Sequence, residues 1–139
     1  MIAYPDASLV VAALTGEVGS SKADAWLSEY LADLAVSGWL NLEVASGLAA
    51  KARNEDISAE QHRAARDFYA RAAETAVQKL QITSKTFANA TLMIELAAGL
   101  RAGDALHLAI AEAHQATLFT LDVRQAEAGR KIGVPTVLV

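Results

Sequence analysis

Short apolar segments alternate with longer helical patterns along the chain, and this alternation restricts the fold more than any other feature. The apolar segments lie at residues 2–5, 34–39, 80–83, 117–121 and 136–139. Short apolar strands separated by helices are typical of a parallel sheet that is buried on both faces. The pattern therefore predicts an α/β fold, a three-layer α/β/α sandwich with a central parallel sheet of about four to five short strands.

Capping residues indicate where the intervening helices begin. Ser58 and Gln61 have the spacing of a capping box. Asn41 is expected to cap a helix that starts at Leu42, and Asp122 is expected to cap the last helix. The predicted helices cover residues 7–14, 20–34, 42–53, 59–79, 84–98, 105–113 and 123–131.

Length and composition point to one globular domain spanning residues 1–139. The chain has 139 residues, 53 % of them hydrophobic, and no cysteine, which excludes a disulfide framework, a thiolate metal site and a cysteine nucleophile. The net charge of −4 argues against a surface that attracts nucleic acid everywhere, but it allows a local basic rim. No apolar run reaches the ~18 residues of a membrane span, and Asp6 interrupts the first run, so we expect a cytoplasmic protein without a membrane partner.

Four acidic residues fall where strands end or helices begin. Asp6 and Asp122 each follow a predicted strand, and Glu43 and Asp104 lie in first helical turns. Ligands of open α/β sheets bind at the carboxyl ends of the strands. We therefore expect these carboxylates to gather at one edge of the sheet.

Helix capping explains each of these acids singly, because Asp is a favoured N-cap and acids in a first turn complement the helix dipole. Capping does not explain why the acids collect at one edge, or why Asp104 stands alone in the uncharged stretch 102–111. Carboxylates that are brought together repel one another unless a proton or a cation intervenes. Oxygen ligands suit Mg²⁺ or Mn²⁺, which support phosphodiester hydrolysis.

Four segments carry a resemblance to a known family. They are Tyr4-Pro5-Asp6-Ala7-Ser8, Leu42-Glu43-Val44, residues 101–109 (Arg-Ala-Gly-Asp-Ala-Leu-His-Leu-Ala) and Thr120-Leu121-Asp122. In this order and at these spacings, the chain resembles PIN-domain ribonucleases, and among them the VapC-like toxins of bacterial type II toxin–antitoxin systems. The resemblance covers essentially the whole chain.

The resemblance implies a metal-dependent endoribonuclease that hydrolyses RNA phosphodiester bonds as the toxin of a toxin–antitoxin pair. It makes Asp6, Glu43, Asp104 and Asp122 the catalytic acids, with Asp6, Asp104 and Asp122 as ligands of Mg²⁺ or Mn²⁺. Ser8 and Thr120 would support them. The implied partners are an RNA substrate, with a tRNA or rRNA loop the expected target, a cognate antitoxin and a second copy of the chain.

Other residues near the acids have weaker signals. Arg101 and Arg124 lie within a few residues of Asp104 and Asp122 and are the best candidates for guiding RNA phosphates. His107 lies one turn after Asp104, and we expect it to pack or support rather than to bind metal.

One alternative stays open, a non-catalytic PIN-like module that binds RNA or protein without cutting. Other acid-based folds fit less well. A haloacid-dehalogenase-type phosphatase would need an Asp where Ser8 stands. A receiver domain would need a further acid beside Asp6 and a Lys after a late strand, and neither is evident in this chain. Ribonuclease H would need long antiparallel strands at its start, whereas here a helix follows the first short strand. Structure-specific DNA nucleases carry large helical insertions, for which this chain has no room.

Overall fold

The computed structural model describes residues 1–139, and five short parallel strands run through its centre. The strands are β1 (Ala3–Pro5), β2 (Ala35–Ser37), β3 (Gln78–Leu80), β4 (Thr117–Thr120) and β5 (Thr136–Leu138). β4 pairs with β1 and β5, and β2 pairs with β3, all in parallel. A single bridge between Ala3 and Leu34 links the two parts, which gives the order β3-β2-β1-β4-β5.

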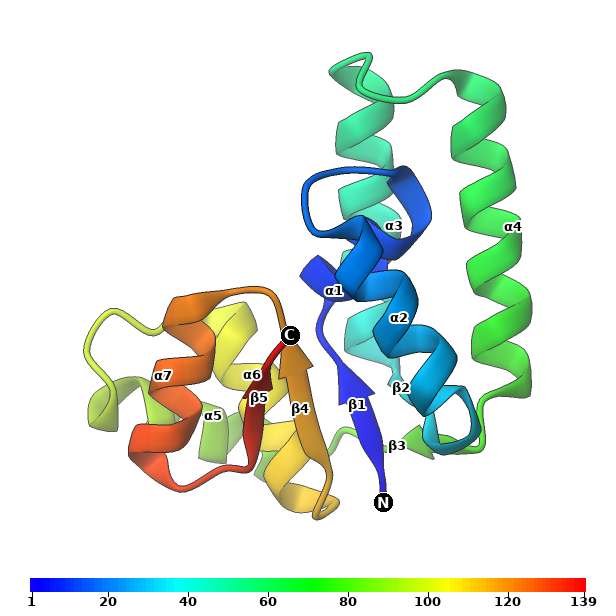
Figure 1. The fold of residues 1–139 in the computed structure, drawn as a ribbon. Coiled ribbons are helices and arrows are strands. Elements are labelled where there is room, and N and C mark those ends of the chain that lie inside the picture. The colour runs from blue at the N-terminus through cyan, green and yellow to red at the C-terminus, as the bar shows by residue number, and fades with distance from the viewer.

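Seven α-helices connect these strands and cover the sheet. They are α1 (Ala7–Thr15), α2 (Ser20–Tyr30), α3 (Gly38–Arg53), α4 (Ala59–Thr75), α5 (Ser84–Leu96), α6 (Ala102–Ala113) and α7 (Val123–Ile132). Figure 1 shows α1–α4 on one side of the strands and α5–α7 on the other. This follows from right-handed crossovers, because the chain moves outward from β1 to β3 and then returns across the sheet to β4 and β5. The predicted three-layer α/β/α fold is confirmed.

The core lies between the sheet and both helical layers. One cluster of 27 buried hydrophobic residues joins them. Every residue of 105–111 in α6 is buried, so this helix is apolar on all sides and lies at the centre of its layer. The N-terminal end of α6, where Asp104 lies, is thereby held in a fixed position beside the sheet. None of the helices is both long enough and apolar enough to cross a membrane.

The boundary between β2 and α3 differs from the prediction. The strand ends at Ser37 and the helix starts at Gly38, so the predicted strand 34–39 and the helix start at Leu42 are wrong. Ser37 is the N-cap, because its Oγ accepts a hydrogen bond from the Leu40 amide at 3.1 Å. The side chain of Asn41, the predicted cap, instead accepts a hydrogen bond from the Tyr69 hydroxyl at 2.8 Å.

Other predicted boundaries shift by a few residues. α2 ends at Tyr30 and continues as a 3-10 turn to Asp33, and α4 ends at Thr75 rather than at 79. β3 therefore begins at Gln78, before the predicted 80–83. Its first two residues are exposed because β3 is an edge strand, so its sequence lacks the apolar pattern of a buried one. The capping box of Ser58 and Gln61 is confirmed.

Candidate carboxylate site at the sheet edge

Two of the four predicted acids follow neighbouring strands. Asp6 comes directly after β1, and Asp122 follows β4 after one intervening residue. β1 and β4 pair in parallel, with Pro5 opposite Phe119, so both acids lie at the same edge of the sheet. Glu43 lies in the second turn of α3, because this helix begins at Gly38, so its predicted place in a first helical turn is wrong. Asp104 lies in the first turn of α6, as predicted, and α6 leads into β4.

Asp6 is buried and fixed by three hydrogen bonds. Its Oδ1 accepts from the Ser8 hydroxyl at 2.7 Å and from the Leu9 amide at 3.1 Å, and its Oδ2 accepts from the Thr120 hydroxyl at 2.5 Å. Burial raises the pKa of the Asp6 carboxyl, and these hydrogen bonds offset part of that rise. The bond to Leu9 also makes Asp6 the N-cap of α1.

Ser8 and Thr120, the two predicted supporting residues, connect Asp6 to the segment that carries Asp122. The Ser8 hydroxyl accepts a hydrogen bond from the Leu121 amide at 3.2 Å, and the Thr120 hydroxyl accepts one from the Asp122 amide at 2.9 Å. Each hydroxyl therefore accepts from the second segment while it donates to Asp6. This arrangement holds the ends of β1 and β4 in register around the buried carboxylate.

Asp122 caps α7 with only one of its two carboxylate oxygens. Its Oδ1 accepts from the amides of Arg124 at 2.8 Å and Gln125 at 3.3 Å. No hydrogen bond is formed by its Oδ2. Capping and membership of an acidic cluster are therefore compatible for this residue, because the two roles use different oxygens.

Glu43 is held by a buried chain of hydrogen bonds that the sequence did not reveal. Its Oε2 lies 2.6 Å from His107 Nε2, and His107 Nδ1 lies 2.9 Å from the Tyr4 hydroxyl, which is hydrogen-bonded to Ser37 Oγ at 2.7 Å. A carboxylate only accepts, so His107 Nε2 carries a proton and donates it to Glu43. With a neutral imidazole, Nδ1 then accepts from Tyr4. His107 is 1 % exposed.

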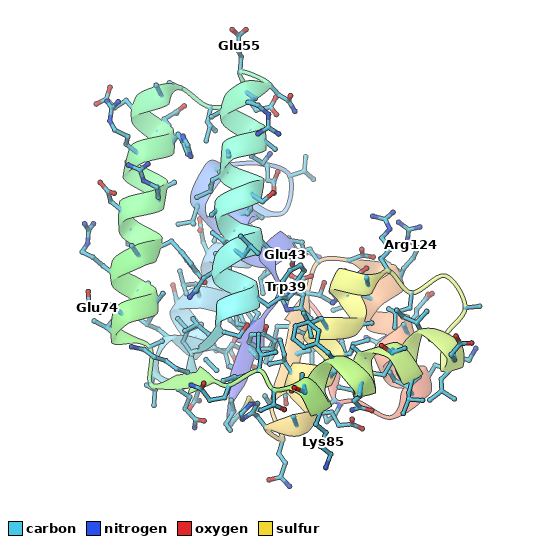
Figure 2. All side chains as sticks on the ribbon, turned by 180° about the vertical axis from the view of Figure 1, so that it is seen from behind. Trp39, Glu43, Glu55, Glu74, Lys85 and Arg124 are labelled. Atoms are coloured by element: carbon cyan, nitrogen blue, oxygen red, sulfur yellow. The ribbon has the colours of Figure 1, made fainter.

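Glu43 also lies against the start of α6. A Cβ at Gly103 would stand 2.9 Å from Glu43 Oε1 and 3.2 Å from the Trp39 ring, so only glycine fits at this position without displacement. Figure 2 shows Trp39 and Glu43 together on α3, with Arg124 at the start of α7. Gly103 is thus a local sequence signal for the close approach of α3 and α6 just before Asp104.

Asp104 completes the group. Its carboxylate forms no hydrogen bond, and its pKa is raised first by burial and then by the negative charges of the three other acids, Asp122, Asp6 and Glu43, while His107 lowers it. The four predicted acids therefore act on one another electrostatically. A cation would stabilise the ionised Asp104 carboxylate, which has three negative neighbours and only His107 to offset them.

The donor set suits a hard divalent cation, although the side chains do not surround one in their present orientation. No three acidic or histidine side chains are grouped closely enough to hold one ion. The donors present are carboxylate oxygens. Those of Asp104 have no hydrogen-bond partner, whereas Asp122 is held through its Oδ1 by the amides of Arg124 and Gln125. These residues fit Mg²⁺ or Mn²⁺ by the chemistry of their oxygen donors.

The predicted RNA-guiding residues lie beside the acids. Arg101 immediately precedes α6 without capping it, and Arg124 lies in the first turn of α7. Both side chains are exposed.

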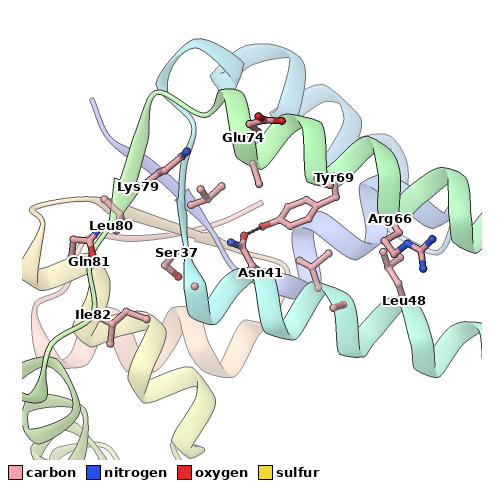
Figure 3. Close-up of a pocket in the computed structure, with 16 residues that line it drawn as sticks. Ser37, Asn41, Leu48, Arg66, Tyr69, Glu74, Lys79, Leu80, Gln81 and Ile82 are labelled. Atoms are coloured by element: carbon pink, nitrogen blue, oxygen red, sulfur yellow. Dashed lines mark hydrogen bonds between the residues drawn. The ribbon is translucent and has the colours of Figure 1, made fainter.

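The largest cavity lies apart from the acids. It has a volume of about 620 Å³ and lies between α3, α4 and the edge strand β3, and none of the four acids lines it. Figure 3 shows the hydrogen bond from Tyr69 to Asn41 in this cavity. The acids therefore lie at the sheet edge, outside the largest hollow of the molecule.

Comparison with known proteins agrees with this architecture. The family model of the PIN domain matches residues 3–131 of the chain. The structure is similar to that of PAE2754 from Pyrobaculum aerophilum, at 19 % identity over 92 % of this chain and 86 % of that chain, with a TM-score of 0.64. It is also similar to FitAcB from Neisseria gonorrhoeae, at 15 % identity over 97 % of this chain and 96 % of that chain, with a TM-score of 0.70.

At these identities the two solved structures show a shared fold. No curated protein sequence matches the chain. The family model, however, spans both helical layers and all strands except β5. The chain therefore belongs to the PIN-domain family, whose members are generally nucleases.

Proposed function

We propose that the chain is a metal-dependent endoribonuclease, the VapC-like toxin of a type II toxin–antitoxin pair. The observation that carries this proposal is the arrangement of the acids. Asp6 and Asp122 follow the paired strands β1 and β4, and burial together with the charges of the other three acids raises the pKa of the unpartnered Asp104 carboxyl. A cluster of carboxylates at the carboxyl edge of a parallel sheet needs a cation to compensate it, and RNA phosphates are bound through such cations.

In this proposal Asp6, Asp104 and Asp122 hold Mg²⁺ or Mn²⁺. The bound cation supplies a nucleophile from water at neutral pH and stabilises charge on the phosphate oxygens. Asp6 provides the fixed reference point, because its position is set by Ser8, Leu9 and Thr120.

The attacking water would be held by Asp6 and Asp104. Glu43, which is hydrogen-bonded to His107, and Asp122 would complete the shell or orient that water. Arg101 and Arg124 guide the RNA backbone toward the acids.

The substrate and partners follow from the same assignment. We propose a loop of tRNA or rRNA as the substrate, since unstacked bases are readily bound in single-stranded segments. The protein would act in the cytoplasm as a homodimer and be held inactive by its cognate antitoxin.

Replacement of Asp6 by Asn tests the proposal. Asn also caps helices, so Asp6→Asn keeps the cap of α1 and removes the charge. We expect Asp6→Asn to abolish Mg²⁺- or Mn²⁺-dependent cleavage of structured RNA in a gel assay, with an unchanged circular dichroism spectrum. Asp104→Asn, whose carboxylate has no hydrogen bond to lose, should do the same.

Asp24→Asn is the matched control, because Asp24 is exposed on α2 and is not part of the acidic cluster. It should cleave like the parent. If Asp6→Asn cleaves RNA as fast as the parent, Asp6 has no catalytic role. A parent protein that binds RNA but never cuts it would favour the non-catalytic module.

A further inference from the structure

A second, smaller cavity lies directly beside Asp104. It has a volume of about 270 Å³ and lies between the connection from α5 to α6 and the exposed side of α7. Its polar lining residues are Arg101, Asp104, Arg124, Gln125, Glu127 and Lys131. Because Asp104 belongs both to this cavity and to the acidic cluster, a polymer bound at the acids has a direct path into it.

Three cationic side chains around this cavity have no acidic partner. Arg101, Arg124 and Lys131 form none of the ion pairs in the structure, which involve Lys51, Arg66, His107 and the N-terminus. The whole chain carries a net charge of −4. Asp104 and Glu127 line the same cavity, so its cations exceed its acids by one, and this local positive excess in an acidic chain favours the binding of an anion.

The wall of the cavity contains a buried polar group without a partner. Gln125 is 1 % exposed, and its Oε1 accepts no hydrogen bond. Its Nε2 donates to the Asp104 carbonyl at 3.5 Å, which leaves the oxygen as the unsatisfied end of the amide. A buried acceptor without a donor is unfavourable, so this wall of the cavity carries one unmet hydrogen-bond acceptor.

The cations are spaced along the cavity rather than collected at one point. Lys131 is seven residues beyond Arg124 on α7, about two turns or roughly 10 Å along the helix axis. Arg124 and Lys131 are thus two separate cationic positions along α7, with Glu127 between them, and Lys131 is the one farther from Asp122.

We propose that this cavity binds a ribose-phosphate unit of single-stranded RNA next to the bond that is cut. The inference rests on the proposed nuclease function and adds the place where the substrate backbone leaves the acids. Arg101, Arg124 and Lys131 attract the phosphates, and Lys131 is the contact farthest from the reaction centre.

The test compares two neighbouring cations on the last turn of α7. Lys131 lines the cavity and Arg130 does not. Lys131→Glu and Arg130→Glu make the same charge change and remove the same favourable interaction with the helix dipole. Both are made in the Asp6→Asn background, so that binding of a fluorescent single-stranded RNA is measured by anisotropy without cleavage.

We expect Lys131→Glu to weaken binding about tenfold, and to reduce the dependence of log K on log salt concentration by about 0.7, the value for one lost phosphate contact on a single strand. Arg130→Glu should change the affinity less than twofold, and Lys131→Arg should bind like the parent. Thermal melting confirms that the variants are folded, and Lys131→Gln gives a second, milder change at the same site.

Equal weakening by Lys131→Glu and Arg130→Glu would overturn the inference, because it would show only a general charge effect. No weakening by Lys131→Glu and Lys131→Gln would also overturn it. Failure of the nuclease proposal is read separately, from a parent protein that binds the RNA but does not cut it in the presence of Mg²⁺ or Mn²⁺.

Discussion

The hydroxyl of Tyr4 organises the surroundings of Glu43 from a position inside the core. It links Ser37, the N-cap of α3, to His107 on α6, and His107 holds the Glu43 carboxylate. Burial raises the pKa of the Tyr4 hydroxyl far above its usual value, so Tyr4 stays neutral at any pH where the protein is folded. Tyr4 and His107 are thus positioning residues for Glu43.

Tyr4→Phe tests this role. The change leaves Ser37 and His107 without a shared buried partner, and we expect it to lower the free energy of unfolding by about 1–3 kcal/mol. Loss of an outer partner of a site residue should lower kcat by about 10–100-fold. Tyr69→Phe is the control, because it also removes one hydroxyl, from a hydrogen bond at the surface. A Tyr4→Phe variant with the parent kcat would contradict a positioning role.

Asp104 makes the stability of the protein depend on pH. Its raised pKa means that the folded chain holds the proton more tightly than the unfolded chain. The resulting stabilisation is complete below the unfolded pKa of about 3.9 and is lost as the pH rises through the raised folded pKa. At neutral pH without divalent cations, the ionised Asp104 therefore destabilises the fold.

We expect Asp104→Asn to raise the Tm at pH 7 in the presence of a chelator, and the difference from the parent to shrink as the pH falls toward 4. Added Mn²⁺ should raise the Tm of the parent more than that of Asp104→Asn. Differential scanning fluorimetry across this pH range measures both effects, with Asp24→Asn as a control that follows the parent. A lower Tm for Asp104→Asn at pH 7 would contradict the account of its environment.

At the scale of elements, α7 packs unusually close to β5 and α6. A Cβ at Gly129 would lie 2.1 Å from Thr136 Oγ1 and 2.9 Å from Leu108 Cδ2. This contact sets the distance of α7 from the sheet and therefore the placement of Asp122 at its start. The absence of a side chain at residue 129 is part of what builds the site.

Gly129→Ala is expected to lower the free energy of unfolding by about 1–3 kcal/mol, since the extra methyl group must displace the core. Gly38→Ala, in the first turn of α3, meets no atom within 4 Å and should be neutral or slightly stabilising. Free energies of unfolding measured in urea for the two variants distinguish a packing effect at Gly129 from a general effect of replacing glycine. Equal stability of Gly129→Ala and the parent would show that Thr136 and Leu108 can move to accept a methyl group at no cost.

The order of the elements and the layers could be predicted from the sequence, because alternating apolar and helical patterns depend on local composition. The start of α3 could not. Ser37 and Asn41 are both good N-caps, and the choice depends on Tyr4 and Tyr69, which are distant in sequence. The bounds of β3 were predicted a few residues too late for a similar reason, because an edge strand has exposed residues such as Lys79 and lacks a continuous apolar pattern.

The positions of Asp6, Asp104 and Asp122 could be predicted, because strand ends and helix starts are local features of the sequence. Glu43 was predicted one turn too near the start of its helix, because the N-cap of α3 at Ser37 was not recognised. The hydrogen-bond partners of the acids could not be predicted. His107 and Glu43 are 64 residues apart, and Tyr4 and His107 are 103 apart. Only the fold brings these groups together.

At the scale of the whole molecule, we propose that residues 1–139 form one cooperative domain, because a single core cluster joins the sheet to both helical layers. Trp26 packs on Phe119 of β4, and Trp39 lies near His107 of α6, so the two tryptophans report on contacts with separate elements.

Unfolding in urea should therefore follow one transition, with the same midpoint by tryptophan fluorescence and by far-ultraviolet circular dichroism. Separate midpoints for the two signals would show that unfolding populates an intermediate. Variants with a single tryptophan, Trp26→Phe and Trp39→Phe, assign each signal.

We propose that folding brings Asp6, Asp104 and Asp122 into one site for a divalent cation. A crystal soaked with Mn²⁺ and measured at the manganese absorption edge would locate this site. We expect an anomalous peak at the carboxyl edge of β1 and β4, within ligand distance of carboxylate oxygens from at least two of these residues. A peak elsewhere, or none at saturating Mn²⁺, would show that these residues do not form a cation site.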